Sequence, residues 1–107
     1  MRELRDYTTR DGVAVAREWL RGLRDKTSLA RIQMRLDSLA RGNFGDCKPL
    51  RDGVWELRID SGPGYRVYYA VLDNVAILLL CGGDKRRQDG DIDRAVSYLN
   101  DYVERTR

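Results

Sequence analysis

The clearest chemical signal in the sequence is a run of cations and an amide where the most apolar stretch of the chain ends. Residues 75–81 are apolar throughout and are followed by Gly82-Gly83-Asp84-Lys85-Arg86-Arg87-Gln88. The pattern predicts a buried strand, a glycine turn, the cation cluster and then a helix. Binding sites commonly form where a strand ends in such a loop. Guanidinium, ammonium and amide groups there favour a phosphate-bearing partner, because all of them donate hydrogen bonds to oxygen.

Two arginines upstream of this loop could join the cluster. Residues 55–59 alternate between apolar and charged types, and a second strand pattern covers residues 65–72 after a Ser-Gly-Pro-Gly turn. Arg58 and Arg66 then project from the face opposite their apolar neighbours. If the loop after the third strand lies over them, the site is a pocket of cations and an amide. Such a pocket would stabilise the extra negative charge of a pentavalent phosphorane through preorganised electrostatics.

Each of these side chains also has a plainer structural interpretation. Arg58 could pair with Glu56 or Asp60 on an exposed strand, and Arg66 could pair across to Asp60. The loop residues could be solvated or could mark the start of a helix, and they are Lys85, Arg86 and Gln88. The choice depends on how the sheet bends, which the sequence leaves open.

The composition excludes several kinds of catalytic site. The chain has no histidine, so Ser-His-Asp and Cys-His catalysis are excluded, as is histidine as a general base. The two cysteines, Cys47 and Cys81, lack the short spacing of a metal site and are expected to be free thiols. We therefore expect no metal and no cofactor, with any chemistry left to Arg, Lys, Tyr, Gln and carboxylates.

Length and charge narrow the protein class only a little. At 107 residues the chain is expected to form a single domain over residues 1–107. Its net charge is +3, and 17 of its 20 cations are arginines, which suits phosphate binding but is equally typical of a GC-rich genome. The sequence lacks a signal-peptide pattern and an apolar run of membrane-spanning length, so we expect a cytoplasmic protein without membrane contact.

The spacing of apolar residues predicts an α+β domain with the order β-α-α-β-β-β-α. Strand patterns lie at residues 3–7, 55–59, 65–72 and 75–81, and helical patterns at residues 16–23, 29–40 and 92–103. Lys48-Pro49-Leu50 offers an additional edge strand, where proline is tolerated. Asp89 or Asp91 is expected to cap the last helix. The last three strands are expected to form an antiparallel meander packed against helices.

Three blocks of the sequence resemble the RelE/ParE toxin superfamily, and especially its HigB-like, phage-related addiction-module killer proteins. The blocks are Gly53-Val54-Trp55-Glu56-Leu57-Arg58-Ile59, Gly62-Pro63-Gly64-Tyr65-Arg66-Val67-Tyr68-Tyr69, and Gly82 to Gln88 with Asp91-Ile92 and Ala95. The resemblance covers nearly the whole chain. It implies a RelE/ParE-like α+β fold, in which two N-terminal helices pack on a twisted antiparallel sheet that is followed by a C-terminal helix.

The resemblance also implies a function and a set of partners. It implies the toxin of a type II toxin–antitoxin system, acting as a ribosome-dependent, metal-independent mRNA endoribonuclease that inhibits translation. The implied partners are the ribosome and mRNA, a cognate helix-turn-helix antitoxin of the HigA type, and operator DNA through the antitoxin complex. Two alternatives stay open: a ParE-like inhibitor of DNA gyrase, and an inactive homologue that acts only in repression of its own operon.

On these grounds we expect seven residues to form the site. Catalytic roles are expected for Arg58, Arg66, Lys85 and Arg86. Contacts to RNA are expected from Lys48, Tyr68 and Gln88. Arg66 would hold the scissile phosphate, and Lys85 is the better candidate for proton transfer.

The chain departs from RelE at two positions. Glu56 stands where RelE has a lysine, and Ile92 lies near its catalytic tyrosine, so that role is vacant or is filled by Tyr68.

Overall fold

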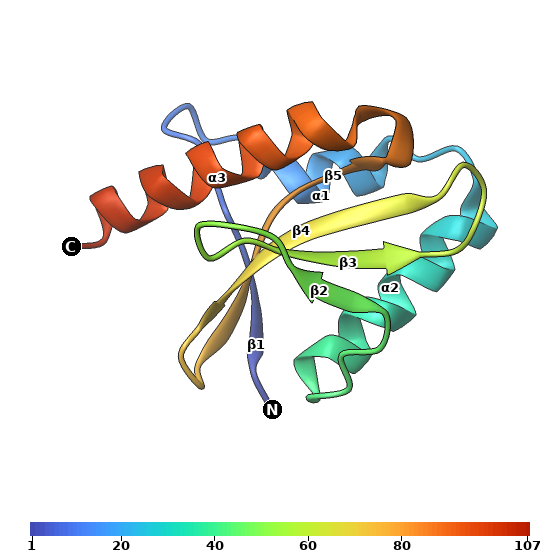
Figure 1. Ribbon diagram of the computed structural model, residues 1–107, viewed down its shortest axis with the longest axis horizontal. Coiled ribbons are helices and arrows are strands. Elements are labelled where there is room, and N and C mark those ends of the chain that lie inside the picture. The colour runs from blue at the N-terminus through green and yellow to red at the C-terminus, as the bar shows by residue number, and fades with distance from the viewer.

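A five-stranded sheet runs through the protein and has helices on both of its faces, as the computed structural model of residues 1–107 shows (Figure 1). The elements in chain order are β1 (Glu3–Asp6), α1 (Val15–Arg21), α2 (Lys26–Ala40), β2 (Cys47–Pro49), β3 (Trp55–Ile59), β4 (Tyr65–Leu72), β5 (Ala76–Asp84), the short 3₁₀ helix η1 (Lys85–Arg87) and α3 (Gln88–Arg105). The α+β class and the additional edge strand, which is β2, are therefore confirmed. None of the helices is long and apolar enough to cross a membrane.

The sheet is mixed, and this corrects the expectation that it is antiparallel throughout. The strand order is β1-β5-β4-β3-β2, and the pairs from β2 to β5 are antiparallel. β1, however, pairs with β5 in the parallel direction. The chain between these two strands includes both N-terminal helices and three strands, and a long connection of this kind permits parallel pairing where a hairpin does not.

Strand alternation divides the core into two layers, one on each face of the sheet. On one face, Leu57, Val67 and Tyr69 pack against apolar residues of α1 and α2. On the other face, Tyr68 and Leu80 pack with residues of α3. β5 lies between β4 and β1 and is buried from Ala76 to Gly83, which agrees with the unbroken apolar run expected of an interior strand.

The start of the last helix differs from the expectation. Neither Asp89 nor Asp91 caps α3, which has no side-chain cap; Asp84 instead caps η1, since its carboxylate accepts a hydrogen bond from the backbone amide of Arg86 at 3.0 Å. η1 then runs directly into α3 at Gln88, so the helix begins earlier than its apolar pattern indicates. The two expected caps instead lie in the first turn of α3, where carboxylates interact favourably with the helix dipole.

Gly82 and Gly83 form the end of β5 and not the turn expected from the sequence. Side chains from two helices lie very close to both glycines. A Cβ atom on Gly82 would lie 2.2 Å from the ring of Trp19 in α1, and one on Gly83 would lie 2.0 Å from Oδ2 of Asp91 in α3. The two glycines are therefore required by close packing, which lets the strand pass between both helices.

We expect Gly82→Ala to destabilise the fold by about 1–3 kcal/mol, because the new methyl group must displace the packed ring of Trp19. Thermal denaturation of the purified protein measures the effect. Gly90→Ala is the matched control: Gly90 lies in α3, and a Cβ atom there would meet nothing within 4 Å. That substitution is expected to be neutral or to stabilise by up to about 1 kcal/mol. Equal melting temperatures for the two variants would contradict the packing argument.

Candidate active site

Arg58 and Arg66 lie directly opposite each other in the antiparallel pair of β3 and β4. Their side chains therefore leave the same face of the sheet next to each other. Like charges in this position repel and destabilise the sheet unless an opposite charge lies between them. The arrangement agrees with the neighbouring positions expected from the sequence, and it requires an acidic partner.

The partner is Glu56, whose side chain is fully buried. Its carboxylate accepts a hydrogen bond from Nε of Arg58 at 3.1 Å and lies 3.4 Å from Nε of Arg66. It also accepts a hydrogen bond from the side-chain amide of Gln88 at 2.5 Å. A buried carboxylate is tolerated when it is paired and hydrogen-bonded in this way. Glu56 thus joins β3, β4 and the start of α3 at one point.

Lys85 reaches the same region through a backbone contact. Its amide donates a hydrogen bond to the carbonyl oxygen of Gly64, at 2.9 Å, in the turn between β3 and β4. Gly64 has φ of +85°, a left-handed conformation that favours glycine. A Cβ atom on Gly64 would lie 3.5 Å from both a terminal nitrogen of Arg66 and Cδ of Lys85. The turn therefore holds these two cations close to each other.

A cavity of about 340 Å³ opens between these side chains and is called the Arg66 cavity here. Its cations are Arg58, Arg66 and Lys85, and two acids, Asp46 and Asp60, also line it. Three of the four residues expected to be catalytic therefore lie around one space. The space is large enough for a phosphodiester group and has a local excess of one positive charge, three cations against two carboxylates.

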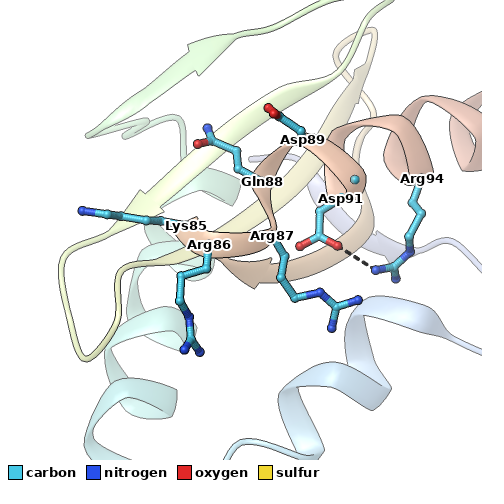
Figure 2. Close-up of a pocket in the computed structure, with 8 residues that line it drawn as sticks. Lys85, Arg86, Arg87, Gln88, Asp89, Asp91 and Arg94 are labelled. Atoms are coloured by element: carbon cyan, nitrogen blue, oxygen red, sulfur yellow. Dashed lines mark hydrogen bonds and ion pairs between the residues drawn. The ribbon is translucent and has the colours of Figure 1, made fainter.

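Arg86, the fourth expected catalytic residue, does not line the Arg66 cavity. Its side chain is 78% exposed and pairs with Asp84 at 3.0 Å. Figure 2 shows the side chains of Lys85 and Arg86 pointing in different directions. The reason is the 3₁₀ turn of η1, which rotates successive residues around its axis and so separates neighbours in sequence. Arg86 therefore does not share the Arg66 cavity with the other three candidates, although it lines a neighbouring cavity together with Lys85, and its catalytic role stays a prediction.

Tyr68 is also placed differently from the expectation. It shares the face of Arg66, as strand alternation requires, but apolar residues of α3 cover it and leave it 0% exposed. Burial and the negative charges of Glu56 and Asp91 raise the pKa of its hydroxyl well above the usual value. A side chain buried in this way cannot contact RNA or transfer a proton to it. Both roles considered for Tyr68 are therefore wrong.

The other two expected RNA contacts lie beside the Arg66 cavity without lining it. Lys48 is exposed on β2 and stands opposite Glu56 in the strand register. Gln88 is half-buried, and its amide is already bound to Glu56. Lys48 is thus free to meet a ligand at the edge of the sheet, whereas the side-chain amide of Gln88 is engaged in holding the buried carboxylate.

The fold and the site together define a small α+β protein with a cation-lined cavity over a buried carboxylate at one end of its sheet. The sequence profile of the family described as "Phage derived protein Gp49-like (DUF891)" matches residues 18–96. An uncharacterized protein of Haemophilus influenzae is 51% identical over 77 residues, which are 72% of this chain and 78% of that protein. The chain therefore belongs to the Gp49-like family of phage-derived proteins, a RelE/HigB-like toxin–antitoxin family.

Proposed function

We propose that the protein is the toxin of a type II toxin–antitoxin pair and that it cleaves mRNA on the ribosome as a metal-independent endoribonuclease. The observation that carries this proposal is the Arg66 cavity, in which two guanidinium groups and an ammonium group surround a space next to buried Glu56. Membership of the family implies an antitoxin partner. The proposed antitoxin is a helix-turn-helix protein of the HigA type, and the complex would bind operator DNA.

The contacts of Glu56 leave hydrogen-bond donors available for a substrate. Arg58 uses Nε to contact Glu56, and its two terminal nitrogens make no hydrogen bond within the protein. Arg66 uses Nε toward Glu56 and one terminal nitrogen toward the carbonyl oxygen of Tyr65, at 3.1 Å, which leaves the other terminal nitrogen free. Because the guanidinium of Arg58 is held by its Nε hydrogen bond to Glu56, and that of Arg66 by its bond to Tyr65 and its ion pair with Glu56, these free donors are held in place before a phosphate arrives.

In the proposed reaction, the 2′-oxygen of one nucleotide attacks the adjacent phosphorus and loses its proton to water. The phosphorane that forms carries an additional negative charge, which Arg58 and Arg66 stabilise through hydrogen bonds to the non-bridging oxygens. The bond to the 5′-oxygen then breaks, and the ammonium group of Lys85 gives that oxygen a proton. The products are a 2′,3′-cyclic phosphate and a free 5′-hydroxyl. DNA is not a substrate, because it lacks the attacking hydroxyl.

Expression of the chain without an antitoxin is expected to arrest growth and to produce new mRNA ends that carry 5′-hydroxyls within coding regions. Mapping of 5′ ends after induction measures this, and co-expression of the protein encoded next to the toxin gene is the control. Growth arrest with intact transcripts would contradict the nuclease proposal. A DNA-damage response with stable mRNA would indicate a gyrase inhibitor instead, and absence of arrest would indicate an inactive homologue.

A further inference from the structure

A second cavity lies on the other side of the same end of the sheet. It has a volume of about 470 Å³, and we call it the Trp19 cavity. Tyr65 of this cavity and Arg66 of the first are adjacent on β4, so strand alternation sends their side chains to opposite faces. Pro63, in the exposed turn between β3 and β4, lines both cavities. A flexible ligand that crosses this turn can therefore enter both.

Two aromatic rings form a fixed corner of the Trp19 cavity. The rings of Trp19 and Tyr65 meet edge to face, with their centroids 5.9 Å apart and an angle of 70° between their planes. The indole is also held against Gly82, where a single methyl group would collide with it. The corner is therefore rigid before any ligand binds. Aromatic faces of this kind bind nucleobases by stacking, and they do so with little sequence preference.

Three arginines border the same cavity, and they are Arg86, Arg87 and Arg94. Two of them have acidic partners, because Arg86 pairs with Asp84 and Arg94 pairs with Asp91 at 2.8 Å. Arg87 is exposed and makes no ion pair or side-chain hydrogen bond within the protein. Figure 2 shows Arg87 and Arg94 extending to the same side, toward the blue helix, which is α1. Arg87 is thus a free cation beside the aromatic corner.

We propose that the Trp19 cavity is a second nucleotide subsite, which binds a nucleotide of single-stranded RNA close to the scissile phosphate. The base stacks in the corner of Trp19 and Tyr65, and the guanidinium of Arg87 binds the phosphate. This inference rests on the proposed function, because RNA supplies the continuous strand that crosses Pro63 between the two cavities. It assigns a role to Arg87, a cation of the loop that does not line the Arg66 cavity. A nucleotide uses both features of the cavity, the aromatic surface for its base and the unpaired guanidinium for its phosphate. A segment of the antitoxin needs no stacking surface of this kind, so the features favour a nucleotide.

Fluorescence of Trp19 tests the subsite directly. The chain has two tryptophans, so Trp55→Phe leaves Trp19 as the single reporter. The probe is a short 2′-O-methyl RNA, which cannot be cleaved because its 2′-oxygen is blocked. We expect saturable quenching by this RNA, no quenching by an abasic strand of the same length, and an affinity at least about tenfold lower for Arg87→Glu. Arg41→Glu makes the same change in charge at an exposed residue that lines neither cavity, and its effect is expected to be small.

Three results would overturn the subsite. They are an absence of quenching, equal loss of affinity in Arg87→Glu and Arg41→Glu, and a response of Trp19 to the antitoxin but not to RNA. The cleavage assay separates this inference from the proposed function. Quenching that is sensitive to Arg87, in a protein that cleaves no mRNA, supports the subsite and contradicts the nuclease. Cleavage of mRNA without quenching supports the nuclease and contradicts the subsite.

Discussion

Replacement of Arg66 by alanine is expected to lower the rate of mRNA cleavage by about 100- to 1,000-fold and to remove growth arrest. Arg66 is the cation most firmly held in its cavity, since its side chain is only 14% exposed and is bound to both Glu56 and the backbone of Tyr65. In the proposed reaction, its free terminal nitrogen is the donor that binds the oxygen on which charge develops in the phosphorane. A ribosome-dependent cleavage assay with purified components measures the rate, and growth after induction measures toxicity.

The same variant is expected to keep most of its affinity for the antitoxin. Circular dichroism and a binding titration with the antitoxin check that the variant is folded and still forms the complex. Arg41→Ala serves as the matched control, because Arg41 is an exposed arginine outside the cavity, and it is expected to retain toxicity. Equal loss of cleavage and antitoxin binding in Arg66→Ala would assign the residue to folding or to the interface and would contradict a role in phosphate binding.

Most of the fold could be predicted because its signals are local. The alternation over residues 55–59 and the apolar run that becomes β5 report directly which faces are buried. The direction of β1 could not be predicted in this way. The residues of a short strand do not indicate which strand it pairs with or in which direction. β1 pairs with a strand about seventy residues later in the chain. The sequence does not indicate the cap at Asp84, because the apolar pattern that predicts the helix begins only after η1.

The site could be predicted where strand geometry determines it and not elsewhere. The turn after β3 places Arg58 opposite Arg66, so their proximity follows from alternation and loop length. The burial of Tyr68 depends on where α3 lies, and the direction of Arg86 depends on the 3₁₀ turn. The pairing of Arg58 with Glu56, one of the plainer interpretations of the sequence, is confirmed, but Glu56 as the shared partner of both arginines is not among those interpretations. Two arginines facing each other require an acid on the same strand face, and Glu56 lies two residues before Arg58, which was the available signal.

Glu56→Ala is expected to destabilise the protein by roughly 3 kcal/mol, which lowers the melting temperature by more than about 10 °C. The substitution leaves the mostly buried guanidinium of Arg66 without a negative partner, directly opposite Arg58. Because Arg58 is 36% exposed and water can compensate part of its charge, we place the loss at the lower end of the range for a broken buried pair. Thermal and chemical denaturation of the purified variant measure the loss.

A matched control and a double-mutant cycle make this prediction specific. Asp60→Ala removes an exposed carboxylate that lines the same cavity, and it is expected to change stability by no more than about 0.5 kcal/mol. In the cycle, Glu56→Ala is expected to cost less in an Arg66→Ala background than in the wild type, because the cation that needs compensation is then absent. If Glu56→Ala costs the same in both backgrounds, the carboxylate does not hold Arg66. The rigid donor arrangement on which phosphate binding depends would then need another cause.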